Sequence, residues 1–451
     1  KGGEKENRYM RLMNRVIKPG VKTKVLMLSA TPVNNRFYDL RNQLALAYEG
    51  DPSEFNEKLN IKSDIDTIFR QAQKVYNAWC KLPEKERTTA TLLSQLDFDF
   101  FEVLDSVTIA RSRKHIQTYY DVADIGNFPK RNKPISLRPK LTTRPNAINY
   151  KEVYELLSKL HLTIYTPTAF IQPSKLQKYL SEDETEKFRS GRELGIQRLM
   201  SINLLKRMES SVHSFLLTVK RIYDYLYDTS HAIDDFIATG ANNLNEMPDL
   251  SSEADEFDYD DQNTDFFNVG KKVKIDLRDM DYISWKREMD EDIDNLQLLI
   301  LMIEDITPEY DFKLNELIRI IREKAAAPIN PGNKKILIFT AFSDTAEYLY
   351  ENISGMALKE LGLHTALVTG SVDGKTTIPK FKPDMNHVLA CFSPKSKDRD
   401  VLYPKDKTDI DILIATDCIS EGQNLQDCDY CVNYDIHWNP VRIIQRFGRI
   451  D

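Results

Sequence analysis

The residues best suited to chemistry are short hydroxyl, glycine and acidic side chains that directly follow apolar runs of the chain. Hydroxyl groups and free backbone N–H groups hydrogen-bond phosphate oxygens, so this pattern indicates phosphate recognition. Ser, Thr and Asp are also the usual N-caps of helices, and for any one residue alone we favour that interpretation. The residues concerned are Ser29, Ala30, Thr31, Thr340, Thr369, Gly370, Ser371, Thr416, Asp417 and residues 433–435.

The apolar runs themselves predict the element that positions these side chains. Residues 335–340, 364–369, 411–416 and 430–434 are short and continuously apolar, and helical segments such as 344–352 alternate with them. Continuous apolar strands separated by helices are typical of a parallel sheet that is covered on both faces. Ligands of such a sheet gather at the carboxyl ends of its strands. We therefore expect an α/β lobe in the last third of the chain.

The preceding two thirds predict mostly helix. An amphipathic helix is expected over residues 8–17, with Met10, Met13, Val16 and Ile17 on one face, and residues 24–29 predict a buried strand. Residues 52–120, 150–237 and 282–324 show helical periodicity, most clearly in 204–227. A Pro- and Arg-rich linker is expected at 126–147, and a poorly packed acidic loop at 246–265.

Composition bounds the class of protein. The chain has 451 residues, of which 41% are hydrophobic and 29% charged, which is enough for two or three globular domains. The longest apolar run, residues 298–303, is too short to cross a bilayer, so no membrane partner is expected. Five cysteines in so long a chain indicate reduced thiols and a cytoplasmic location. The net charge of -7 does not exclude nucleic acid, because the first 24 residues are strongly basic.

Four segments carry a resemblance to a known family. Residues 28–35 (LSATPVNN) with Asp39 and Leu40 resemble motif III of superfamily-II helicases, and within them the Swi/Snf-like translocases in their bacterial, RapA-like branch. Residues 336–349 are similar to motif IV and residues 414–425 to motif V. Asp435, residues 438–440 and residues 445–449 (QRFGR) are similar to motif VI and its lead-in. The segment 109–114 resembles the end of the family's first lobe, and 205–211 carries a loose resemblance.

The resemblance implies a motor of two RecA-like lobes that binds ATP between them and nucleic acid across both. Residues 1–125 would be the remainder of the first lobe, 126–325 a helical insertion, and 326–451 the second lobe. The insertion, with basic helices such as 206–221, would grip duplex DNA or dock a protein partner. The leading function is an ATP-dependent translocase on double-stranded DNA. Alternatives are an RNA or RNA-polymerase-recycling motor, and a non-catalytic interaction module of helicase shape.

The resemblance also assigns roles to individual residues. Arg449 falls at the first arginine finger of motif VI, and its guanidinium would reach a triphosphate held by the other lobe. Gln445 would hydrogen-bond near the γ-phosphate or the attacking water. Gly422 and Asn424 would bind the nucleotide. Nucleic-acid phosphates would be held by Thr416, Thr369, Gly370 and Ser371, and coupling between nucleotide and lobe movement would fall to Ser29, Ala30 and Thr31.

The sequence departs from the family pattern at two motifs. Neither the phosphate-binding loop G-x-x-x-x-G-K-[ST] nor the acidic DExx motif is present in these residues. The use of ATP and Mg²⁺ therefore depends on motifs that the family places upstream of motif III. We expect the chain to be the C-terminal part of a motor core, inactive as given. No metal site is expected, because Cys428 and Cys431 lack a second ligand pair and favour packing.

Overall fold

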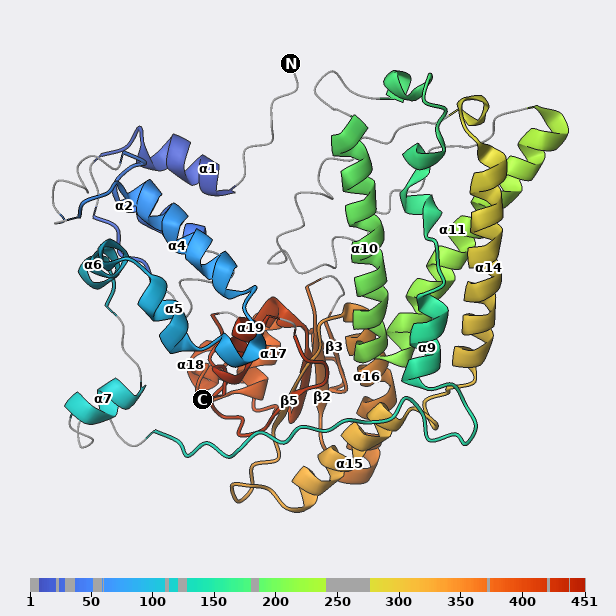
Figure 1. The fold of residues 1–451 in the computed structure, drawn as a ribbon. Coiled ribbons are helices and arrows are strands. Elements are labelled where there is room, and N and C mark those ends of the chain that lie inside the picture. Colours follow the sequence, from blue (N-terminus) through green and yellow to red (C-terminus); the bar gives the residue numbers. More distant parts are fainter. Residues whose placement is uncertain are drawn as a thin grey trace. The chain divides into compact units, whose positions relative to one another are not determined.

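The computed structural model divides the chain into two compact units, Lys1–Asn132 and Lys133–Asp451 (Figure 1). The structure describes residues 8–21, 24–28, 37–51, 59, 61–109, 113–120, 128–179, 186–240, 276–370, 374–419, 422–437 and 439–450.

The described part of the first unit is helical. Its core joins α2, α4 and α6 through buried side chains such as Leu40, Phe69 and Val103. The Asp64 side chain caps α4 by accepting the backbone N–H of Thr67 at 2.9 Å. Its elements are α1 (Arg8–Leu12), the π-helical turn η1 (Met13–Ile17), α2 (Phe37–Ala47), α4 (Ile65–Trp79), the 3-10 turn η2 (Glu84–Glu86), α5 (Thr89–Gln95), α6 (Phe98–Val107) and α7 (Arg113–Tyr119).

The strand predicted for residues 24–29 is wrong over the residues that are described. Residues 24–28 form no strand, and Leu26 and Leu28 are 84% and 89% exposed. A strand must pair its backbone groups with a neighbour, and the described residues of this unit contain no strand to pair with. The predicted apolar face of 8–17 is also largely unburied, because Met13 is buried whereas Met10 and Val16 are exposed.

The second unit begins with a segment without helix or strand, residues 133–140, followed by a bundle of long helices (Figure 1). The periodic stretch 204–227 is two helices rather than one, because Ser211 leaves the helical conformation and its side chain caps the next helix at Ser214 N. Trp285, Phe215 and Leu296 lie in the bundle core. The elements are α9 (Tyr150–Leu157), η3 (Thr163–Tyr165), η4 (Pro167–Phe170), η5 (Leu176–Tyr179), α10 (Glu186–Ser210), α11 (Val212–Thr239), η6 (Leu277–Asp279) and α14 (Tyr282–Glu304).

A five-stranded sheet follows the bundle in the order β3-β2-β4-β1-β5. β2, β4, β1 and β5 are parallel, and β3 pairs antiparallel with β2 at the edge. The four parallel strands lie within the four predicted runs, whereas β3 was not predicted. The elements are α15 (Phe312–Ala326), β1 (Ile336–Phe339), α16 (Ser343–Met356), η7 (Ala357–Leu361), β2 (Thr365–Val368), β3 (Lys375–Thr376), α17 (Met385–Phe392), α18 (Arg399–Leu402), β4 (Ile412–Ala415), η8 (Asp417–Ile419), β5 (Cys431–Asn433) and α19 (Pro440–Phe447).

Alternate residues of the strands enter two different cores. Ile336 and Ile338 of β1 pack with α15 and α16 on one face, whereas Leu337 and Phe339 pack with α17 on the other. Because successive side chains of a strand point to opposite faces, a strand covered on both sides must be apolar throughout. The expected RecA-like α/β lobe is confirmed. No helix in the described ranges has the length and apolar character that a membrane crossing needs.

Candidate functional site

The predicted strand-end residues of the second lobe do meet at one edge of the sheet. Val368 of β2 and Phe339 of β1 both pair with Ala415 of β4, so the segments that follow these three strands leave the sheet side by side. Thr416 donates its backbone N–H to the Val368 carbonyl oxygen at 3.3 Å. This edge therefore brings together parts of motifs IV, V and VI that are distant in sequence.

Thr416, Thr369 and Gly370 lie together at this edge. A Cβ atom placed on Gly370 would lie 3.7 Å from the Cβ of Cys418, directly beyond Thr416. Gly370 is exposed and Thr369 half-buried, but Thr416 is only 7% exposed. A backbone at Gly370 is therefore open to a phosphate, whereas the Thr416 side chain is largely covered. Ser371 lies outside the described residues.

Arg446 is the buried centre of motif VI. Its side chain is fully buried and forms a bidentate pair with Asp417, from Nε to Oδ1 at 2.7 Å and from Nη2 to Oδ2 at 2.6 Å. Nη1 donates to the Asp435 carbonyl oxygen at 3.2 Å, and the guanidinium lies over the Phe339 ring. Burial alone would lower the pKa of Arg446, but the Asp417 carboxylate outweighs it and raises that pKa. The pair ties α19 to the end of β4.

Asp435 connects the same edge to the helical bundle. Its carboxylate accepts hydrogen bonds from the hydroxyls of Thr340 at 2.6 Å and Ser210 at 2.7 Å, and from the backbone N–H of Ala341 at 2.9 Å. The Ser210 hydroxyl also lies 2.8 Å from that of Thr345 on α16. All four side chains are buried. Thr340 is therefore neither a helix cap nor open to a ligand, because its hydroxyl is used inside the protein.

Lys313 of α15 adds a charge to the same junction. Its Nζ donates to the carbonyl oxygens of Glu209 at 2.5 Å and Ser210 at 2.9 Å, and lies over the Tyr434 ring. A cation at the C-terminus of a helix is stabilised by the helix dipole and by the last free carbonyl groups. Burial nevertheless lowers the pKa of Lys313. The C-terminus of α10 is thus fixed to the lobe.

Arg449, the predicted arginine finger, is half-buried and held by its own lobe. Nε donates to the carbonyl oxygen of Gln445 and Nη1 to that of Gln423, both at 3.1 Å. In return, the Arg449 carbonyl oxygen accepts the backbone N–H of Leu425 at 2.9 Å. The end of motif VI is thereby bonded to the loop of motif V, which contains the predicted nucleotide ligands.

A second cation, Lys397, reaches the same loop. Its Nζ donates to the Gln423 Oε1 atom at 2.5 Å. Burial lowers the pKa of Lys397, and the nearby positive charge of Arg449 lowers it further. Two cations converging on one neutral residue form a site that an anion would stabilise.

Asp427 fixes the turn that carries Lys397. The Asp427 carboxylate accepts the backbone N–H groups of Lys395 at 2.7 Å and Ser396 at 3.0 Å, and the Ser396 hydroxyl at 2.6 Å. Burial raises the pKa of Asp427, but these hydrogen bonds outweigh it, so the pKa is lowered. The Lys397 side chain is therefore presented from an ordered turn.

The remaining predicted ligands differ in accessibility. Gly422 is exposed with φ of +68°, which favours glycine, and Asn424 is exposed. Gln445 is only 7% exposed, and its Oε1 accepts a hydrogen bond from Arg442 at 3.3 Å, so it is not a solvated residue of the helix surface. Ser29, Ala30 and Thr31, and also Trp438, lie outside the described residues.

The basic residues predicted to grip DNA are partly used within the protein. Arg207 is 1% exposed and pairs with Asp344 at 3.0 Å. Lys220 pairs with Glu304 at 2.5 Å, whereas Arg221 is exposed. Arg207 is thus a structural contact between α10 and the start of α16.

Sequence reasoning missed the roles of Arg446, Asp417 and Lys397. Arg446 and Asp417 lie within the segments that resemble motifs VI and V. An acidic residue after a predicted strand, together with an arginine on a helix with apolar neighbours, could have indicated a buried ion pair. No sequence pattern indicated a role for Lys397, because its position beside Gln423 depends on how the turn of residues 393–398 packs.

Comparison with known proteins identifies the domain that carries this site. Residues 313–451 match the family described as helicase conserved C-terminal domain. A stretch of 41 residues is 56% identical to the uncharacterized ATP-dependent helicase YqhH of Bacillus subtilis, covering 9% of this chain and 7% of that protein. A stretch of 139 residues is 26% identical to fml2 of Schizosaccharomyces pombe, named as an ATP-dependent DNA helicase, covering 30% of this chain and 16% of that protein.

Two solved structures are similar to larger parts of the chain. The helicase domain of Pyrococcus furiosus Hef aligns with 66% of this chain and 50% of its own, at 17% identity and a TM-score of 0.27. The C-terminal part of the Fun30 ATPase domain aligns with 66% of this chain and 75% of its own, at 15% identity and a TM-score of 0.23.

Proposed function

We propose that the chain is the C-terminal part of an ATP-dependent motor of superfamily II, in the Swi/Snf-like, RapA-like group, that translocates on double-stranded DNA. The observation that carries the proposal is the convergence of Arg449 and Lys397 on Gln423, inside the helicase C-terminal domain. Motif VI and motif V meet at this residue, as a nucleotide site requires.

Two cations at this position suit phosphoryl transfer. Such enzymes act mainly by positioning the reactants and neutralising the charge on the γ-phosphate oxygens. Arg449 would contribute a planar, permanent charge, and Lys397 a point charge on an ordered turn. Exposed Gly422, with its left-handed backbone, leaves room for a ligand to approach the motif V loop. These features fit a nucleotide polyphosphate.

For catalysis, Arg449 would exchange its present acceptors. Its guanidinium now donates to two neutral carbonyl oxygens, of Gln445 and Gln423. A phosphate oxygen carries negative charge whereas a carbonyl oxygen is neutral, so a γ-phosphate within reach would be the stronger acceptor for the guanidinium. The present bonds would hold the finger folded back when no nucleotide is bound.

The rest of the ATP site is proposed to lie on motifs absent from these residues. The phosphate-binding loop and the DExx motif are not in the sequence, so the ligands of Mg²⁺ would lie on those motifs. Nucleic-acid phosphates would contact the Gly370 backbone and Thr369, with Thr416 less accessible. Arg221 is the exposed cation of α11 available for a grip by the bundle.

The test is ATP hydrolysis by the complete gene product, stimulated in parallel by double-stranded DNA, single-stranded DNA and RNA. Arg449→Ala should abolish hydrolysis, a loss of about 10³-fold or more, while DNA binding stays unchanged. Near-normal turnover of Arg449→Ala would refute its role. Stimulation by RNA alone would favour an RNA motor, and absence of ATP hydrolysis in the unaltered protein would favour a non-catalytic interaction module.

A further inference from the structure

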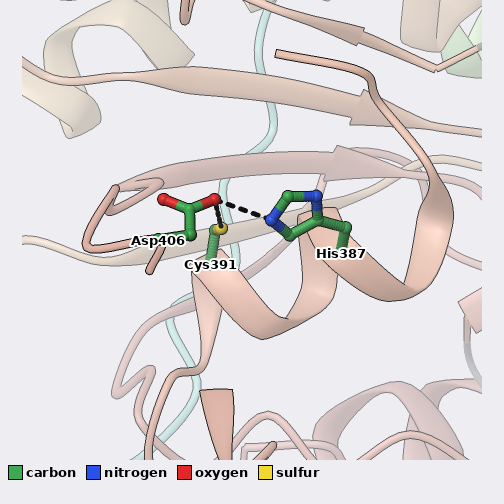
Figure 2. Close-up of side chains that lie close together, drawn as sticks. All are labelled: His387, Cys391 and Asp406. Atoms are coloured by element: carbon green, nitrogen blue, oxygen red, sulfur yellow. Dashed lines mark hydrogen bonds and ion pairs between the residues drawn. The ribbon is translucent and has the colours of Figure 1, made fainter. Parts of the chain in front are cut away.

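Three side chains capable of binding a metal ion meet on the α17 side of the sheet (Figure 2). His387 and Cys391 stand one turn apart on α17, and Asp406 comes from the loop after α18. Asp406 Oδ2 lies 2.6 Å from His387 Nε2 and 3.7 Å from Cys391 Sγ. One donor atom of each residue lies within 4.8 Å of the others.

The surroundings hold each side chain in place. The Asp406 Oδ1 atom accepts the backbone N–H of Thr408 at 2.8 Å, which leaves Oδ2 directed at the imidazole and the thiol. The His387 ring stacks on Tyr403, with centroids 4.2 Å apart, and contacts Phe381 at 4.5 Å. Cys391 is fully buried. Fixed ligands lower the entropic cost of binding an ion, as the outer contacts of known metal sites do.

We propose that His387, Cys391 and Asp406 bind one divalent transition-metal ion of the zinc type through Nε2, Sγ and a carboxylate oxygen. A thiolate, an imidazole and a carboxylate form a donor set that Zn²⁺ accepts, with a water molecule as fourth ligand. The thiolate and carboxylate together carry two negative charges, which a divalent cation balances inside a largely buried site.

Binding requires a proton release and a small movement. The S–H bond of Cys391 breaks, a bond from sulfur to the metal forms, and the proton leaves to solvent. The proton shared between His387 Nε2 and Asp406 Oδ2 must also move, to Nδ1 of the same ring, so that the Nε2 lone pair can bind the metal. Metal–ligand distances of about 2.0–2.3 Å place the donors of a tetrahedral site about 3.3–3.8 Å apart. The distance between Sγ and Oδ2 already fits, whereas Nε2 must retreat from Oδ2 by about 1 Å. His387 is partly exposed and can make that movement.

The ion would serve the structure of the lobe rather than ATP chemistry. It would connect α17 to the 403–409 loop, in addition to the stacking of Tyr403 on His387, the hydrogen bonds of Asp406 and the nearby backbone bond from Ile410 N to Cys391 O. The proposal is therefore independent of the proposed motor function.

The test measures Zn²⁺ and Co²⁺ binding by the full chain, which contains all three ligands. One ion should bind per chain, with the near-ultraviolet charge-transfer absorption of a cobalt–thiolate bond and an increase in the melting temperature. Cys391→Ser should remove that absorption, and Asp406→Asn, at a partly exposed position that tolerates an isosteric change, should weaken affinity at least about tenfold. Cys428→Ser, which removes another buried thiol of the same lobe, should change neither.

Two results would overturn the site. One is an unaltered protein that binds no Co²⁺, or binds it without thiolate absorption. The other is binding that survives Cys391→Ser and Asp406→Asn but is lost in Cys428→Ser, which would move the ion to Cys428 and Cys431. Because Asp406→Asn keeps the shape of the side chain, its far-ultraviolet circular dichroism distinguishes a lost ligand from a lost fold.

Discussion

Arg446 and Asp417 form a buried, bidentate ion pair that joins the helix of motif VI to the end of β4. The Arg446 side chain is fully buried and that of Asp417 is 21% exposed, so the charge of Arg446 is stabilised chiefly by Asp417, with the Asp435 carboxylate 3.8 Å away. The nearby Arg449, three residues later, is half-buried and bonded to carbonyl oxygens. The inner arginine thus fixes the position from which the outer arginine acts.

Arg446→Ala should destabilise the second unit by about 3–5 kcal/mol, because it leaves the Asp417 charge without its buried partner. Urea unfolding followed by circular dichroism measures this loss. Arg322→Ala is the matched control: Arg322 pairs with Glu360 at 2.8 Å, but both side chains are half exposed. That pair should contribute less than about 1 kcal/mol. Equal losses in the two variants would contradict the structural role of Arg446.

Lys397→Gln should raise the KM for ATP of the complete protein at least about tenfold, because a hydrogen bond to a charged group contributes about 1.5–3 kcal/mol. Lys395→Gln is the control, since Lys395 is exposed on the same turn and is fixed through its backbone N–H rather than its side chain. Steady-state kinetics at saturating DNA gives the KM of each variant. An unchanged KM in Lys397→Gln would remove Lys397 from the nucleotide site.

Ser210 and Asp435 should be energetically coupled across the junction of the bundle and the lobe. A double-mutant cycle with Ser210→Ala and Asp435→Ala should give an interaction free energy of about 0.5–3 kcal/mol, measured by chemical unfolding. Ser201→Ala is the control, because its hydroxyl bonds to Gln197 of the same helix, more than two turns from Ser210. Additive effects of the Ser210 and Asp435 changes would show that these two side chains do not stabilise each other across the junction.

Asp292 gives the bundle a specific pH dependence. It is fully buried in α14, where its carboxylate accepts the backbone N–H groups of His161 at 2.7 Å and Leu162 at 2.6 Å. Burial raises its pKa above 3.8 despite these bonds. The folded state therefore holds this proton to higher pH than the unfolded state, and stability falls as pH rises from the ordinary to the raised pKa.

Asp292→Asn should remove that fall, as measured by unfolding free energies from pH about 4 to about 7. Asp64→Asn should change the pH dependence of stability in the opposite direction. The hydrogen bonds of Thr67 lower the pKa of Asp64, so the stability that Asp64 contributes is lost as pH falls. A difference between the unaltered protein and Asp292→Asn that stays constant with pH would contradict the buried titration of Asp292.

The second lobe could be predicted because its signals are local. Four continuous apolar runs separated by helices are typical of a doubly covered sheet, and the parallel strands lie within the predicted limits. The strand predicted at 24–29 is apolar too, but burial of a strand depends on neighbours elsewhere in the chain, and residues 24–28 are left unpaired. The helix break at Ser211 was not predicted, because the helical periodicity continues on both sides of it. The Ser211 hydroxyl that caps the next helix does not change the apolar pattern.

Similarly, the candidate site was predictable in its place but not in its contacts. Motif spacing brought Gly422, Asn424 and Arg449 to one edge of the sheet. It did not predict that the Arg449 guanidinium bonds to the Gln423 carbonyl oxygen, or that Lys397 reaches the same residue, because both depend on the packing of turns. The same holds for the proposed metal site. The sequence shows the one-turn spacing of His387 and Cys391, but it does not predict that Asp406 lies beside them.

The anchoring of the α10 C-terminus by Lys313, Ser210 and Asp435 has a mechanical consequence. α11, with 28 residues, starts at this junction and extends for about 42 Å. A rotation of about 5° at its base would displace its far end by about 4 Å. Because α11 packs in one core with α10 and α14, the bundle would move with it, so a change of angle at Asp435 would be largest at the end of the bundle distant from the sheet.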